Sequence, residues 1–179
     1  MKLNLGSRFG DASHFNRSKG FIGVDFEGSE IIHDLRVQPW PFEDSSIEAV
    51  HGSHVLEHLK KDLGYGFIRE CYRILQSGCP VRIAVPDMDK LIRLMRSGIR
   101  AINEVSLSDA AISFEPMNEE DVHKHNYLYC FESLAYMMEK CGFINVNQKD
   151  FGESDYAVLT GVDTALYKEI TIYVEAIKP

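Results

Sequence analysis

Short runs in which apolar and polar residues alternate recur along this chain, and such runs predict β-strands. The clearest are Ile170–Ile177, which alternates throughout, and the run in which Val81, Ile83 and Val85 alternate with Arg82 and Ala84. The predicted strands are Leu3–Leu5, Gly20–Asp25, Glu30–Leu35, Ser46–His51, Pro80–Val85, Phe143–Val146 and Ile170–Ile177.

Three longer stretches repeat their apolar residues every three to four positions, which predicts amphipathic helices. One begins at Asp62 and stops at Ser77-Gly78, where a glycine is well suited to end a helix. A second follows Asp87, a good N-cap residue, and the third spans Phe131–Cys141. His54–Leu59 is predicted to form a short helical turn.

Strands that alternate with helices predict an α/β fold with a mainly parallel sheet. The last two predicted strands have no helix between them, so we expect an antiparallel strand near one edge. The 179 residues suit one compact domain, and we predict a single domain over residues 1–179. Residues 100–126 are polar, fit neither periodicity and carry an acidic run, so we interpret them as an insertion or lid.

Charge and composition narrow the classes of partner. The formal net charge of -8 argues against binding to a nucleic-acid backbone, which requires clustered Lys and Arg. No apolar run reaches the roughly 20 residues that span a bilayer, and no signal peptide is evident. The four cysteines form no CxxC pair, which favours reduced thiols. We therefore expect a cytoplasmic protein that binds neither a membrane nor a nucleic-acid backbone.

Gly6 follows the first predicted strand, and Asp25 and Asp34 lie at the ends of the second and third. Ligands of open parallel sheets bind beyond the carboxyl ends of the strands, where a glycine permits close approach. Asp25 could accept hydrogen bonds from ribose hydroxyls, and Asp34 from an adenine amino group, while the Leu35 N–H donates to the ring. The loop lacks both GxGxxG and the P-loop ending, which favours a nucleoside without pyrophosphate. Each Asp is alternatively a simple turn residue.

His54-Val55-Leu56-Glu57-His58 matches the HxxEH pattern of inverted zinc proteases. The motif directly follows a predicted strand, and no third ligand lies on a matching helix. We therefore expect no metal site, with Glu57 and His58 exposed or acting as local caps and His54 lining a pocket. His125, on the approach to the last helix, is a candidate base or a ligand of a loop carbonyl.

Taken together, these motifs resemble the class I S-adenosylmethionine-dependent methyltransferases of the small type 11 sort. The resemblance covers about Leu3 to Val146, and its most specific part is the His54–Leu59 block after the Ser46–Val50 strand. The other matching segments are Leu3–Gly6, Gly23–Asp25, His33–Leu35, Pro41–Val50, Tyr72–Gly78 and Glu132–Phe143. The resemblance favours a methyltransferase over a zinc hydrolase.

This resemblance implies a three-layer Rossmann-like fold with a seven-stranded sheet of order 3-2-1-4-5-7-6, in which strand 7 is antiparallel. It also implies S-adenosyl-L-methionine as cofactor, S-adenosyl-L-homocysteine as product and a small or medium-sized acceptor. By this resemblance, Gly6 and its neighbours form the loop beside the methionine part of the cofactor, and Asp25 binds the ribose with Phe26 near the adenosine. Asp34 and Leu35 contact the adenine. Ser53 and His54 face the methyl-donor region. The implied cofactor-binding set is Asn4, Leu5, Gly6, Ser7, Arg8, Asp25, Phe26, Asp34, Leu35, Ser53 and His54.

The chain departs from the family pattern in the glycine loop. Ser7-Arg8 stands where a second glycine is usual, and the helix between the first two strands is expected to be missing or reduced. An oxygen or nitrogen acceptor would need a general base, for which His54 and His125 are the candidates and Asp87 a weaker one. Two alternative functions stay open: a non-catalytic methyltransferase-like binding domain, and a nicotinamide-dependent oxidoreductase, which the missing GxGxxG disfavours. Assembly of the chain as a homodimer is also left open.

Overall fold

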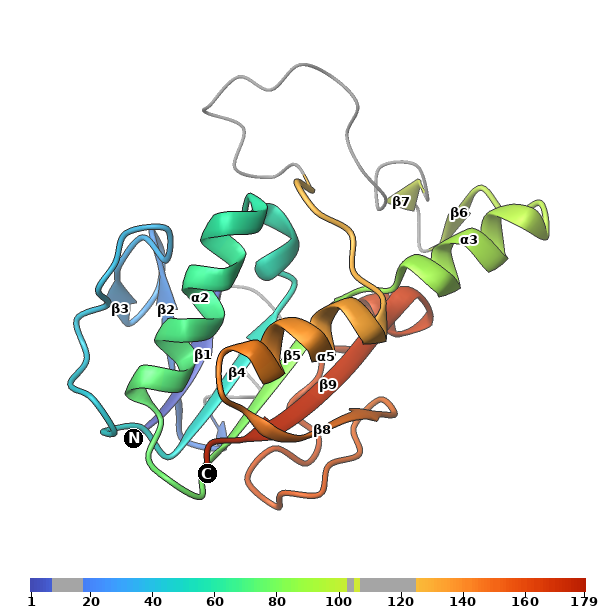
Figure 1. Cartoon of the computed structure of the whole chain (residues 1–179). Helices are drawn as coiled ribbons and strands as arrows, with labels where there is room; N and C mark the ends of the chain where they lie inside the picture. The colour runs from blue at the N-terminus through green and yellow to red at the C-terminus, as the bar shows by residue number, and fades with distance from the viewer. Residues whose placement is uncertain (8–17, 103–104, 107–124) are drawn as a thin grey trace.

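Seven strands form one mixed sheet in the computed structural model, which describes residues 1–7, 18–102, 105–106 and 125–179 (Figure 1). The strand order is β3-β2-β1-β4-β5-β9-β8. Strands β1 to β5 are parallel in this sheet, and β9 is antiparallel to both of its neighbours. The strands are β1 Lys2–Leu5, β2 Phe21–Asp25, β3 Ile31–Ile32, β4 Ala49–Ser53, β5 Pro80–Pro86, β8 Ile144–Lys149 and β9 Thr171–Ile177. The predicted order and antiparallel strand are confirmed.

All three predicted helices form, as α2 (Lys61–Ile74), α3 (Met88–Arg96) and α5 (Phe131–Lys140). Asp87 caps α3 as expected, because its carboxylate accepts the backbone N–H groups of Asp89 and Lys90. The short turn after β4 is the 3-10 helix η1 (Leu56–His58), and a second one, η2 (Ala165–Ile170), precedes β9. No helix in the described parts of the chain has the length and apolarity needed to cross a membrane.

The predicted third and sixth strands differ in length from those observed. β3 has two residues rather than six, because it lies at the sheet edge, pairs only with β2 and is followed by a turn at Asp34. β8 extends to Lys149 and carries an irregularity between Ile144 and Asn147. Of the predicted insertion at 100–126, the structure describes Arg100, the small hairpin of β6 (Ala101–Ile102) and β7 (Val105–Ser106), and residues 125–126; residues 103–104 and 107–124 lie outside the described residues.

One face of the sheet packs against α2 and α5, which lie side by side across it (Figure 1). Alternate strand residues point to this face, as the period of two requires. They join the apolar faces of the two helices in one continuous buried cluster. Its members include Leu3, Leu5, Val24, Val50, Phe67, Ile68, Cys71, Ile74, Val81, Ile83, Val85, Leu134, Met138, Ile172 and Val174.

The opposite face carries polar strand residues and is covered by the connection between β8 and β9. Leu159 and Val162 of this connection pack on Phe21 and Ala49. Beside them Arg82 of β5 is completely buried, although it occupies a polar position in an alternating strand. The antiparallel strands β8 and β9 are therefore joined by a long connection that forms a cover over this face of the sheet.

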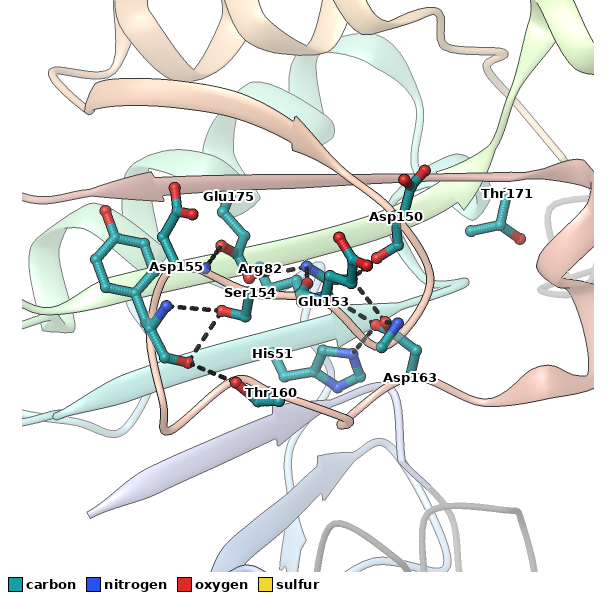
Figure 2. Close-up of polar contacts among 12 residues, drawn as sticks. His51, Arg82, Asp150, Glu153, Ser154, Asp155, Thr160, Asp163, Thr171 and Glu175 are labelled. Carbon is teal, nitrogen blue, oxygen red and sulfur yellow. Dashed lines mark hydrogen bonds and ion pairs between the residues drawn. The ribbon is translucent and has the colours of Figure 1, made fainter.

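Figure 2 shows how the Arg82 guanidinium is held between the connection and β9. It donates two hydrogen bonds to Asp163, of 2.8 and 2.6 Å, and one of 2.8 Å to Glu175. It also donates to the backbone carbonyls of Glu153 and Asp150. This set matches the five N–H donors of a guanidinium, so the buried charge is fully paired.

Two further contacts extend this network through His51 of β4 to Asn4 of β1. His51 lies with Nε2 3.8 Å from Asp163 and with Nδ1 2.7 Å from the side-chain oxygen of Asn4. Burial lowers the pKa of His51, which favours a neutral ring. Burial would raise the pKa of Asp163, but the contacts with His51 and Arg82 outweigh it and lower that pKa to about 2.

We predict that Asp163→Asn lowers the free energy of unfolding at pH 7 by about 3 kcal/mol, because it breaks a buried ion pair. The folded-state pKa of Asp163 lies below its ordinary value of 3.8, so the folded state binds fewer protons. The stabilisation is therefore complete above pH 3.8 and lost as the pH falls through about 2. Urea unfolding at pH 7, 4 and 3 should show the gap between variant and wild type narrowing at the lowest pH.

Asp155→Asn is the matched control, because Asp155 lies on the same connection but its side chain is 58% exposed in a pair with Lys149. This exposed pair should contribute less than about 1 kcal/mol. Equal losses in the two variants would contradict a special role for the buried network.

Candidate functional site

The residues predicted to bind a ligand lie at or just beyond the carboxyl ends of four adjacent parallel strands. In the register, Leu5 of β1 pairs with Val24 of β2 and with Gly52 of β4, and Asp25 pairs with Ile32 of β3. The ends of these strands are thus aligned at one edge of the sheet. This is the edge at which open parallel sheets bind ligands.

Gly6 adopts a left-handed conformation with φ 72° directly after β1. Its N–H donates to the carbonyl of Val24 at 2.8 Å, which ties the loop to β2. A Cβ at this position would lie 2.8 Å from the Cβ of Val55, closer than real side chains approach. The glycine is therefore required by the protein's own packing, in addition to any ligand.

The neighbours of Gly6 present mainly their backbone to this edge. Leu5 belongs to the apolar core, and the Asn4 side chain points to the opposite face, where it contacts His51. Ser7 is buried, and its carbonyl accepts a hydrogen bond of 2.6 Å from the Ser29 hydroxyl. Arg8 and the expected loss of the helix after β1 lie in residues 8–17, outside the described residues.

Asp25 ends β2 and is 7% exposed. One of its carboxylate oxygens accepts the N–H of Phe26 at 2.6 Å, and the Phe26 ring is 38% exposed. Sequence reasoning missed Glu30, whose carboxylate accepts the N–H of Gly23 at 2.9 Å. A Cβ at Gly23 would lie 2.6 Å from both the Glu30 carboxylate and the Ser29 hydroxyl. The glycine at position 23 is therefore the feature of the sequence that could have indicated that these two side chains pack against β2.

Asp34, after β3, is paired with Arg36 on both of its oxygens, at 2.7 to 3.0 Å. This hydrogen bonding lowers the pKa of the Asp34 carboxyl. Leu35 is 7% exposed, and its carbonyl accepts the indole N–H of Trp40. An adenine at this position would share the Asp34 carboxylate with the Arg36 guanidinium.

His54 follows Ser53, the last residue of β4, and has a positive φ of 53°. Its Nδ1 lies 3.1 Å from the Glu57 carboxylate and its Nε2 3.0 Å from the Thr171 hydroxyl oxygen. The Thr171 hydroxyl donates to the Tyr167 carbonyl, so it faces the ring as an acceptor. The two ring nitrogens therefore each face an oxygen atom, one of Glu57 and one of Thr171.

Glu57 is completely buried, contrary to the expectation that it would be exposed. Burial raises the pKa of its carboxyl, but the contact with His54 and the charges of His54, His58 and His125 outweigh burial and lower it. The residue is buried because η1 turns the side chain inward beneath the segment that precedes α5. The backbone carbonyl of Glu57 accepts the N–H groups of Asn126 and Tyr127 from that segment.

His125 is brought from this segment to His58, with their rings in edge contact at 4.9 Å between centroids. Glu57, His58 and His125 can each offer a ligand atom, and these atoms lie within 4.8 Å of one another. The two predicted base candidates, His54 and His125, thus flank the same buried carboxylate. Their separation by 71 positions explains why sequence periodicity could not bring them together.

Residues 13–82 match the sequence model of a family described as a methyltransferase domain. Comparison with curated proteins finds no match. The family resemblance inferred from the motifs is confirmed over the matched residues.

Several solved structures share the fold. An S-adenosylmethionine-dependent methyltransferase from Archaeoglobus fulgidus has a TM-score of 0.65 and 17% identity over 99% of this chain and 85% of its own. An S-adenosylmethionine-dependent methyltransferase from Methanosarcina mazei has a TM-score of 0.62 and 16% identity over 99% of this chain and 91% of its own. A third is phosphoethanolamine N-methyltransferase 2 from Haemonchus contortus, in complex with phosphomonomethylethanolamine and S-adenosylhomocysteine. Its TM-score is 0.59 and its sequence identity 14%, over 99% of this chain and 48% of its own. The Rossmann-like methyltransferase fold is thereby confirmed.

We predict that Gly6→Ala destabilises the protein more than Gly78→Ala. Both glycines have positive φ values, 72° and 76°, so both substitutions incur about 1–2 kcal/mol of backbone strain. An added Cβ at Gly78 has no heavy atom within 4 Å, whereas at Gly6 it meets Val55. The overpacking should cost a further ~1–3 kcal/mol at Gly6, measured by urea unfolding. In a Val55→Gly background, which removes the Cβ and Cγ atoms that the added methyl group meets, Gly6→Ala should cost less, and equal losses at the two glycines would refute the packing argument.

Proposed function

We propose that this chain, with a methyltransferase-domain match over residues 13–82 and a methyltransferase fold, is an S-adenosylmethionine-dependent methyltransferase. The observation that carries the proposal is the alignment of Gly6, Asp25 and Asp34 at one sheet edge, beyond three adjacent strands. Such an arrangement provides close backbone approach and two carboxylate acceptors for a nucleoside. The similar structures support the same cofactor, since they include an S-adenosylmethionine-dependent methyltransferase and a methyltransferase with S-adenosylhomocysteine bound.

In this proposal the adenosine lies across the ends of β2 and β3. Asp25 accepts from the ribose hydroxyls with Phe26 beside the adenosine, and Asp34 with the Leu35 N–H contacts the adenine. The methionine part lies along the backbone of Asn4 to Arg8, with Gly6 nearest to it. Ser53 and His54 then face the methyl group, and S-adenosylhomocysteine is the product.

The chemistry is an in-line displacement at the sulfonium methyl group, in which the carbon–sulfur bond breaks as the acceptor attacks. The protein's main contribution is to align the two reactants and exclude water. A protonated oxygen or nitrogen acceptor would lose its proton to His54 or His125. To accept that proton, a His54 ring nitrogen would have to give up its present contact with Glu57 or Thr171.

We propose a small or medium-sized molecule as the methyl acceptor. The Haemonchus contortus structure contains such an acceptor, phosphomonomethylethanolamine, in a protein with the same fold. The acidic net charge of -8 supports a small acceptor over a nucleic-acid backbone.

We predict that Asp25→Asn weakens binding of S-adenosylhomocysteine to the full chain by about 10–100-fold, because the ribose loses hydrogen bonds to a charged acceptor. Isothermal titration calorimetry of both proteins measures the change. Asp44→Asn is the matched control: Asp44 is 77% exposed, precedes β4 and contacts Arg73 at the opposite end of that strand. Its affinity should equal that of the wild type.

The same titration separates the proposed function from its alternatives. Absence of heat and of any change in melting temperature with millimolar S-adenosylmethionine and S-adenosylhomocysteine would favour a non-catalytic binding domain. The pairing of Asp34 with Arg36 is the structural feature that would favour that outcome. Binding of NADH in place of both ligands would instead favour an oxidoreductase.

A further inference from the structure

We propose that Glu57, His58 and His125 form a binding site for a divalent transition-metal ion. The residues come from η1 and from the segment before α5, which lie far apart in the sequence. Their ligand atoms lie within 4.8 Å of one another. A cation at their centre, with bonds near 2 Å, would draw them together by about 1 Å or more.

The donor set selects the class of ion. One carboxylate oxygen and two imidazole nitrogens are the protein ligands of catalytic zinc sites and of the two-histidine, one-carboxylate iron sites. Mg²⁺ and Ca²⁺ prefer oxygen ligands and fit two imidazoles poorly. Three protein ligands also leave coordination positions for water or for a substrate oxygen. Zn²⁺, Co²⁺, Mn²⁺ and Fe²⁺ are therefore the candidates.

Backbone hydrogen bonds hold the two segments together before any ion binds. The N–H groups of Asn126 and Tyr127 donate to the Glu57 carbonyl at 2.7 and 3.2 Å. The Asn126 side-chain amide donates to the His58 carbonyl at 2.6 Å. The three ligands are thus carried by a backbone that is already positioned, which lowers the entropic cost of binding an ion.

Burial of Glu57 is the second observation that points to a cation. Its carboxylate is completely buried, and within the described residues neither oxygen accepts a hydrogen bond of good geometry. Its close neighbours are the imidazoles of His54 at 3.1 Å and His58 at 4.0 Å. A buried carboxylate needs compensation by charge and by directed contacts, and a metal ion supplies both.

The geometry separates this site from the zinc-protease use of the HxxEH pattern. In that pattern both histidines bind the ion and the glutamate acts as a base. Here the His54 ring lies between Glu57 and Thr171, where it orients the carboxylate as a ligand-supporting group does. Glu57 becomes a ligand and the third ligand is His125, a combination that the motif alone does not specify.

A metal at this position would remove His125 from the list of candidate bases, because its ligand nitrogen would be occupied. His54 would remain the candidate beside the methyl-donor region. Binding of the ion itself requires neither cofactor nor methyl transfer. The test below uses the metal alone, so its result and that of the cofactor titration are independent.

The test is titration of the chelator-stripped full chain with Co²⁺, followed by its visible absorption, and then displacement by Zn²⁺. We expect one Co²⁺ per chain and an absorption band that Zn²⁺ removes. His58→Gln and His125→Gln should each weaken Co²⁺ binding by at least ~10-fold, since each removes a ligand. His33→Gln is the matched control, because His33 contacts the Val37 carbonyl beside β3 and is not part of the cluster.

His58 and His125 are only partly buried, so their variants are expected to fold, which circular dichroism would check. Glu57→Gln adds a third, isosteric variant, counted only if its spectrum is that of the wild type. Absence of saturable binding in the wild type would overturn the proposal. So would equal Co²⁺ affinity in His125→Gln and His33→Gln, which would leave a histidine–glutamate hydrogen-bond network as the role of this cluster.

Discussion

The buried guanidinium of Arg82 is the constraint on which the second face of the sheet depends. A charge in the middle of β5 is tolerated only because Asp163, Glu175 and two backbone carbonyls surround it. Three of those four partners, Asp150, Glu153 and Asp163, belong to the connection between β8 and β9, so their contacts with Arg82 hold this connection against the sheet (Figure 2). Leu159 and Val162 of the connection can then bury the apolar surface of Phe21 and Ala49.

This network also links the cover to the ligand edge. His51 stands between Asp163 and Asn4, and Asn4 lies two residues before Gly6, which turns the chain at the end of β1. Gly6 is in turn limited by Val55 of the segment that leads to η1. The loop proposed to contact the methionine part of the cofactor is therefore positioned from both sides by packing that exists without a ligand, which reduces the cost of ordering on binding.

A second charged centre, around Glu57, lies just beyond the carboxyl end of β4, at the same end of the strands. Its side chain faces His54 and His58, while its backbone carbonyl binds the segment that carries His125. His54 extends the contacts to Thr171 of β9. The candidate base, the proposed metal ligands and the end of β4 thus form one connected unit, so a change at Glu57 should affect all of them together.

The sequence by itself determined the order of strands and helices, the antiparallel last strand, the cap at Asp87 and the strand-end positions of Gly6, Asp25 and Asp34. These features follow from local periodicity, from turn chemistry and from motifs that lie within a few residues of each other. Only the tertiary structure decided the burial of Arg82 and Glu57, the pairing of Asp34 with Arg36 and the meeting of His58 with His125. A polar position in an alternating strand is exposed or buried according to what covers it, and that cover comes here from residues about 80 positions away. Local pattern carries no record of such distant partners.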